Sequence, residues 1–154
     1  MPGAYTRRVM QRHDQDFVLW ARAQAQAIRA AARAGSNLAI DWENVAEEIE
    51  DLGRSERREL ASRIGTIIEH LMKLGASPAA RPRAGWEATV IRERARVAEL
   101  LAESPSLRAE VAALIARETS LARRIVARAL ARHGEAAADL PDYSEAQVLG
   151  DGSL

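Results

Sequence analysis

The sequence contains no cysteine, a single lysine and few aromatic residues. Without cysteine, the chain cannot form a disulfide, a thiolate zinc site or a cysteine nucleophile. Aromatic side chains make up 4% of the 154 residues. Neither sign of charge is in excess, since 22 basic and 22 acidic side chains give a formal net charge of zero. This balance argues against a protein that mainly coats nucleic acid or an anionic membrane.

Long apolar stretches are also missing. No segment approaches the roughly 20 apolar residues that a membrane-spanning helix needs. The first apolar stretch, Phe17 to Trp20, is too short for a signal peptide and lies beside Asp14 and Asp16. We therefore expect a cytoplasmic protein without a membrane segment. No run alternates apolar and polar residues between turn signals, so no strand is predicted.

Helix-forming residues dominate what is present. Alanine is the commonest residue, and every basic side chain except Lys73 is arginine. Alanine, arginine, glutamate and leucine all favour helix, so the composition indicates an all-α protein. The excess of arginine and alanine is typical of a GC-rich genome; an arginine surface selected for phosphates is the alternative interpretation.

Glycine, proline and capping residues divide the chain into helices. We predict helices over residues 14–34, 41–75, 86–103 and 105–133, and a short helix that Ser144 caps and that ends at Leu149. Residues 1–12 are expected to form a flexible basic arm, and residues 135–154 a tail. The second helix should kink or break at Gly53, because Ser55 can cap a new start. The prediction is a single all-α domain over residues 1–154, like a four-helix bundle, with a long second helix and a short C-terminal one.

Caps and apolar stripes refine this prediction. Asp14, Asp41 and Ser104 are the expected caps of the longer helices, and Pro105 suits the first helical position. Apolar residues at helical spacing predict the buried faces. The stripe of the second helix is Val45, Ile49, Leu52, Leu60, Ile64, Ile67, Ile68, Leu71 and Leu74; that of the fourth is Leu107, Val111, Leu114, Ile115, Leu121, Ile125 and Ala129.

Three charged residues interrupt the apolar stripes. Glu56, Arg94 and Glu118 each lie three or four residues from apolar neighbours on their own helix, so each should face the interior or its rim. A buried charge is normally paired, and Arg94 has the donors to bridge both carboxylates. Three interpretations stay open: a structural ion network, positions that reach solvent, or a polar site where Arg94 meets a ligand carboxylate or phosphate.

A run of carboxylates and a central histidine form the second polar feature. Glu47 and Glu48 lie in an acidic stretch that precedes Gly53, and clustered carboxylates suit hard divalent cations. A solvated helix surface is the simpler interpretation. His70 lies at the edge of the apolar stripe, and Ile67 occupies the position three residues before it. The Glu-x-x-His motif of di-iron bundles is therefore absent, and His70 would need partners from other helices.

Other functional motifs are missing or weak. The sequence has no glycine-rich phosphate loop and no nucleophile elbow. The fourth helix ends with a short basic stripe, Arg124, Arg128 and Arg132, but no aromatic residues are interleaved with it. Nucleic-acid binding is thus a third hypothesis.

The segments Asp41 to Glu56 and His70 to Leu74 resemble an uncharacterised bacterial family, domain of unknown function 29. The resemblance continues through Trp86 to Arg94 and Ser104 to Leu107, and it covers nearly the whole chain. It implies an all-helical fold and no established activity. It also implies that Glu47, Glu48, Glu56, His70, Trp86 and Arg94 occupy the family's motif positions.

These features lead to two main hypotheses. The first is a non-enzymatic, homo-oligomeric interaction or structural module, because the long second helix should leave apolar surface for a partner to cover. The second is a metal-binding or enzymatic protein that uses a polar cluster. Its candidate residues are Glu47, Glu48, Glu56, His70, Arg94 and Glu118. No catalytic residue, cofactor or metal can be assigned from the sequence.

Overall fold

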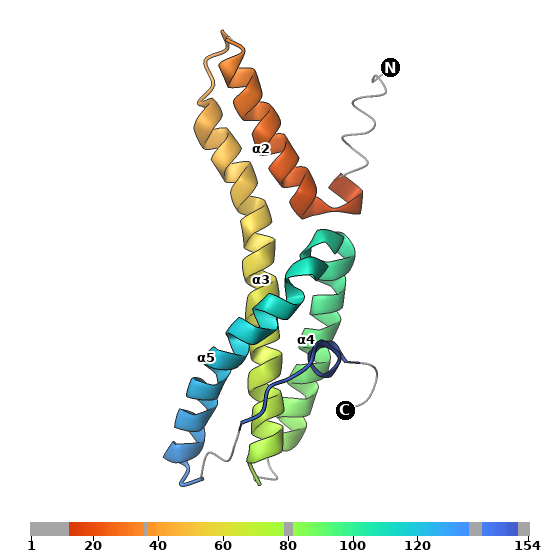
Figure 1. The fold of residues 1–154 in the computed structure, drawn as a ribbon, viewed down its shortest axis with the longest axis vertical. Coiled ribbons are helices and arrows are strands. Elements are labelled where there is room, and N and C mark those ends of the chain that lie inside the picture. The colour runs from red at the N-terminus through yellow and green to blue at the C-terminus, as the bar shows by residue number, and fades with distance from the viewer. Residues whose placement is uncertain (1–12, 36, 79–81, 136–139, 151–154) are drawn as a thin grey trace. The chain divides into compact units, whose positions relative to one another are not determined.

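The protein is all-α. The computed structural model describes residues 13–35, 37–78, 82–135 and 140–150, and within these ranges every regular element is a helix (Figure 1). In chain order the elements are α2 (Phe17–Arg33), α3 (Trp42–Ala76), α4 (Arg83–Glu103), the 3₁₀ helix η1 (Pro105–Glu110), α5 (Val111–Arg132) and α6 (Glu145–Leu149). This confirms the predicted fold class. The predicted arm, residues 1–12, lies outside the described residues.

The chain divides into two compact units. Unit 1 comprises Met1–Arg58 and Leu100–Arg108, and unit 2 comprises Glu59–Glu99 and Ala109–Leu154. Helix α3 therefore contributes its first half to unit 1 and its second half to unit 2. The predicted helices all occur, although α4 begins three residues earlier than expected, at Arg83 rather than Trp86.

Unit 1 is built around a hairpin in which α2 lies beside the first half of α3 (Figure 1). Small residues fill this contact, since Ala21, Ala25 and Ala46 are at most 1% exposed. A side chain at Gly53 would meet α2 directly, because a Cβ there would lie 3.6 Å from the Cβ of Ala21. The two helices can approach closely only because both contribute small residues here.

Unit 2 has a core of large apolar side chains. The second half of α3 contributes Leu60, Ile64, Ile67, Ile68 and Met72, all fully buried. The other helices contribute Val90 and Val97 from α4, Val111, Leu114 and Val126 from α5, and Val148 from α6. Burial of such large apolar side chains is the main favourable term in folding, so this unit holds most of the hydrophobic stabilisation.

Helix α3 does not break at Gly53. It runs without interruption from Trp42 to Ala76, over 35 residues. Of the predicted kink or break, the break is wrong, because Gly53 lies under α2, where the absence of a side chain permits packing rather than ending the helix. At its start, the side chain of Asp41 accepts a hydrogen bond from the backbone N–H of Asn44, which confirms the predicted cap.

The other predicted caps have mixed outcomes. Ser144 caps α6 through a capping box with Gln147, as predicted. For α2 the cap is Asp16 rather than Asp14. Ser104 occupies the predicted position, since its carbonyl accepts from Leu107 N at 3.0 Å, but its buried Oγ makes no hydrogen bond in the structure. The helix that begins there starts as the 3₁₀ turn η1 before it becomes α5.

The apolar stripe of the second half of α3 is largely right, and the stripes of the first half of α3 and of α5 are partly wrong. Val45 and Leu52 were expected inside but are 40% and 50% exposed. In α5, Leu121 and Ile125 are 43% and 40% exposed, because the buried face runs instead through Glu118, Ala122, Val126 and Leu130. An alanine-rich helix offers more than one apolar face, so spacing alone did not select the buried one.

Candidate functional site

Glu118 lies in the interior of unit 2. It is 9% exposed, and its Oε1 accepts hydrogen bonds from Nε and Nη2 of Arg117 at 2.8 and 2.6 Å. A Cβ at Gly65 of α3 would lie 3.1 Å from Oε2 of Glu118, so the glycine makes room for the carboxylate. The predicted inward position of Glu118 is thus confirmed, and its partner is its own neighbour in sequence.

Arg94 binds the end of the C-terminal helix. Its Nε donates to the carbonyl of Val148 at 3.1 Å, and its Nη2 donates to the carbonyl of Gln147 at 2.6 Å. Carbonyls in the last turn of a helix have no partner within the helix, so the guanidinium supplies one. Gly150 has a φ of +84°, and a Cβ there would lie 3.1 Å from the Arg94 side chain. Arg94 therefore attaches α6 to α4.

The predicted bridge between Arg94 and Glu118 is wrong. Nε and Nη2 of Arg94 donate to backbone carbonyls of α6, and Oε1 of Glu118 accepts from Arg117. The spacing on each helix predicted a position in the interior or at its rim, and Glu118 is buried whereas Arg94 is half-buried. Their partners depend on where a distant segment, α6, docks, and helical spacing carries no information on that. Glu56, the third residue of the predicted network, is half-buried in unit 1.

His70 is held by its own helix. Its Nδ1 lies 2.8 Å from the carbonyl oxygen of Thr66, one turn earlier on α3. Because a carbonyl can only accept, this contact places a proton on Nδ1. The side chain is half-buried, as expected for the edge of the apolar stripe.

Glu47 and Glu48 lie exposed on α3 in unit 1. Within the described ranges neither carboxylate has an ion-pair partner, whereas Glu50 and Asp51 beside them bind Arg29 and Arg54. Hydrogen bonds from Arg29 to Glu43 and Glu50 raise the pKa of the arginine and join α2 to α3.

The candidate cluster is divided between the two units. Glu47, Glu48 and Glu56 belong to unit 1, and His70, Arg94 and Glu118 belong to unit 2. Among the residues that the structure describes, no three histidine, aspartate or glutamate side chains are grouped so that they could hold a metal ion. A joint catalytic or metal-binding role of the six residues stays a prediction.

Asp16 makes a set of structural hydrogen bonds that the sequence did not predict. Its Oδ1 accepts from the backbone N–H of Leu19 and from the hydroxyl of Ser106, both at 2.9 Å, and its Oδ2 accepts from the backbone N–H of Ser106 at 2.6 Å. One carboxylate therefore caps two helix starts, and it does so across the 90 residues that separate Asp16 from Ser106. The local signal was an aspartate directly before an apolar helix start; the contact with Ser106 has no sequence signature.

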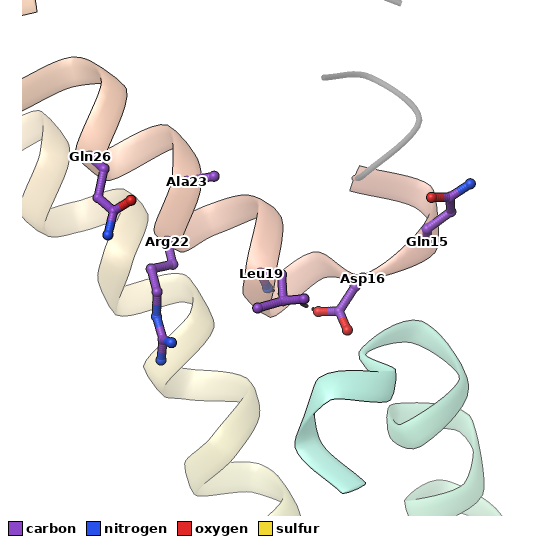
Figure 2. Close-up of a pocket in the computed structure, with 6 residues that line it drawn as sticks. All are labelled: Gln15, Asp16, Leu19, Arg22, Ala23 and Gln26. Atoms are coloured by element: carbon purple, nitrogen blue, oxygen red, sulfur yellow. Dashed lines mark hydrogen bonds between the residues drawn. The ribbon is translucent and has the colours of Figure 1, made fainter. Parts of the chain in front are cut away.

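Asp16 also borders an open depression on α2, with a volume of about 440 Å³. Its other lining residues are Gln15, Leu19, Arg22, Ala23 and Gln26; Figure 2 shows the last four along α2 and Gln15 on the turn that precedes it. Because the oxygens of Asp16 are engaged by α2 and η1, this carboxylate acts as a cap rather than as a group presented to a ligand.

Comparison with known proteins places the chain in a family. The model of the family described as domain of unknown function DUF29 matches residues 13–152. The chain belongs to the DUF29 family. The curated proteins contain no significant match. Among solved structures, an alpha-helical protein of unknown function from Rhodospirillum rubrum is similar, with 28% sequence identity and a TM-score of 0.71.

The alignment with that structure covers 91% of this DUF29 chain and 90% of the other. The similarity therefore extends over nearly the whole of both chains and supports the helical fold. Neither comparison describes an activity or a ligand. In addition, no helix in the described part of this DUF29 protein is both long and apolar enough to cross a membrane.

Proposed function

We propose that this DUF29 protein is a protein-interaction module that self-associates. The proposal rests on large apolar side chains that the folded chain leaves exposed. The exposed residues are Leu19, Leu38, Ile40, Val45, Leu52, Ile91, Leu121 and Ile125. Several of them lie on helices that also have a buried face, so these helices present apolar side chains on two sides. Apolar side chains that are exposed together, such as those one or two turns apart on one helix, mark binding sites on protein surfaces.

Helix α3 carries one such surface in unit 1. Val45 and Leu52 are seven residues apart, which places them on the same side of the helix two turns apart. Their exposed fractions, 40% and 50%, contrast with the complete burial of Ala46 on the neighbouring side. A second copy of the chain is a partner that is always present and that carries apolar surface of its own.

Static light scattering over a concentration series tests this proposal. We expect a mass above that of the 16.8 kDa monomer, and a shift toward the monomer in the variant Leu52→Ser. Ala39→Ser, an exposed small residue outside the helices, is the control and should leave the mass unchanged. A strict monomer at the highest soluble concentration would contradict self-association.

A further inference from the structure

The exposed apolar residues of α3 and α5 have flanking charges of opposite sign. On α3, Glu48 lies three residues after Val45 and four before Leu52, so it shares their side of the helix. No basic residue occurs in α3 before Arg54. We call Val45, Glu48 and Leu52 the acidic face. All three side chains are exposed.

The corresponding face of α5 is basic. Leu121 and Ile125 are one turn apart; Arg124 lies three residues after Leu121, and Arg128 lies three residues after Ile125. We call these four residues the basic face. All four are exposed, and in the described part of the chain Arg124 and Arg128 have no ion-pair partner. Arg123, in contrast, binds the carbonyl of Leu140 and the carboxylate of Asp142. No acidic residue follows Glu118 in α5.

We infer that the acidic face of one molecule binds the basic face of a second molecule. This inference rests on the proposed self-association and specifies which surfaces meet. Two basic faces would place arginines against arginines, and two acidic faces would place carboxylates against carboxylates, so pairing like with like is disfavoured. Pairing unlike faces covers apolar side chains on both sides and brings Glu48 toward Arg124 and Arg128. Because each molecule has both faces, the contact can form twice in a closed dimer or repeat along a chain of molecules.

The apolar residues also explain why a protein helix suits the basic face better than a phosphate backbone. Leu121 and Ile125 alternate with Arg124 and Arg128 along the helix, and a polyanion would leave both apolar side chains uncovered. The acidic face supplies Val45 and Leu52 to cover them and a carboxylate to pair with the arginines.

Charge reversal with mixing tests the pairing. The variant Glu48→Arg makes the acidic face basic, and the double variant Arg124→Glu with Arg128→Glu makes the basic face acidic. In either variant alone the two faces have the same sign, so we expect the dissociation constant of self-association to rise about tenfold or more. In an equimolar mixture each molecule again finds opposite charges, so association should return to within about threefold of wild type.

A neighbouring residue provides a matched control. Glu47 is exposed and unpaired in the described part of the chain, like Glu48, but it points about 100° away around the helix. Glu47→Arg therefore makes the same change in net charge and should leave the dissociation constant near the wild-type value. Thermal melts by circular dichroism verify that each variant is folded. A second measurement uses the wild-type protein alone: its self-association should weaken as sodium chloride is added.

The possible outcomes separate this pairing from self-association in general. Loss of association in both reversed variants and its recovery in the mixture support the pairing. Association that is insensitive to salt and to Glu48→Arg, or equally sensitive to Glu47→Arg, overturns the pairing but leaves the proposed function intact. A wild-type monomer overturns both. A monomer that binds duplex DNA at low salt through Arg124 and Arg128 would assign the basic face to phosphates and also overturn the pairing.

Discussion

Unit 1 and unit 2 achieve helix packing by different means. In unit 2, fully buried isoleucine, leucine, valine and methionine side chains form the core. In unit 1, α2 and the first half of α3 meet through alanines and Gly53. The polar contacts of Asp16 and the ion pairs of Arg29 surround this interface. Small residues allow two helices to come close, but each buries little apolar area, so the stabilisation per contact is smaller.

The comparison predicts unequal stability. Exposed ion pairs contribute little to the free energy of unfolding, typically about 0–1 kcal/mol each. Arg29 and its partners therefore do not replace a hydrophobic core. We expect the first half of α3 to exchange its amide hydrogens faster than the second half, although both belong to one continuous helix. Hydrogen exchange followed by mass spectrometry would show this difference between residues 42–58 and 59–76, and equal protection would contradict it.

The largest expected effect is the loss of a core side chain in unit 2. Ile67→Ala removes a fully buried side chain from the second half of α3. We expect the free energy of unfolding to fall by about 2–5 kcal/mol, because transfer and cavity terms add. Urea denaturation measures this loss in the free energy of unfolding. A loss below about 1 kcal/mol would show that the core of unit 2 is looser than the structure indicates.

A smaller effect is expected at the cap of unit 1. Asp16→Ala removes the acceptor for Leu19 N and for both donors of Ser106. The loss should be about 1–3 kcal/mol, since two helix starts lose their side-chain partner.

Ser104→Ala is the matched control, because Ser104 stands at the N-cap position of η1 but its Oγ makes no hydrogen bond in the structure. This substitution should change the free energy of unfolding by less than about 0.5 kcal/mol, or raise it. Urea denaturation compares the two variants. If Ser104→Ala is the more harmful of the two, the assignment of the cap to Asp16 is wrong.

Loss of the attachment of α6 to α4 is expected to lower the free energy of unfolding by less than the losses above. Arg94→Leu keeps an apolar stem but loses both hydrogen bonds to the carbonyls of Gln147 and Val148. We expect a loss of about 1–2 kcal/mol, with faster exchange in residues 145–150. Gly150→Ala should act in the same direction, because its φ is positive and its Cβ would press on Arg94. An unchanged melting temperature in both variants would contradict the attachment.

The smallest effect on stability is expected on the exposed side of unit 1. Leu52 is half-exposed, so Leu52→Ser should change the free energy of unfolding of the monomer by less than about 0.5 kcal/mol. The same variant is expected to weaken self-association. Denaturation at low protein concentration, compared with light scattering at high concentration, separates the two effects. A large loss of monomer stability would place Leu52 in the core after all.

Much of the fold could be predicted because helix signals are local. The aspartate at position 41, the serine at position 144 and the uninterrupted stripe from Leu60 to Ile68 each act within a few residues, and the structure confirms them. Gly53 shows the limit of such signals. A glycine within a helical pattern has the same local cost whether it ends a helix or permits a close contact, and the position of α2 decides between the two.

The candidate site illustrates the same limit. Spacing alone placed Arg94 and Glu118 in the interior or at its rim, because each follows the apolar stripe of its helix. Which groups they meet depends on segments distant in sequence: α6 brings carbonyls to Arg94, and Gly65 of α3 makes room for Glu118. The contact of Asp16 with Ser106, across 90 residues, has no local signature at all.

The sequence by itself determined the all-α class, most helix boundaries and the absence of cysteine chemistry, since these follow from composition and short-range geometry. Only the tertiary structure decided which side of each alanine-rich helix is buried, which charges are paired and where apolar side chains stay exposed. The physical reason is that burial of alanine distinguishes weakly between alternative faces. The long-range packing of larger side chains then selects among them, and it leaves Val45, Leu52, Leu121 and Ile125 on the surface.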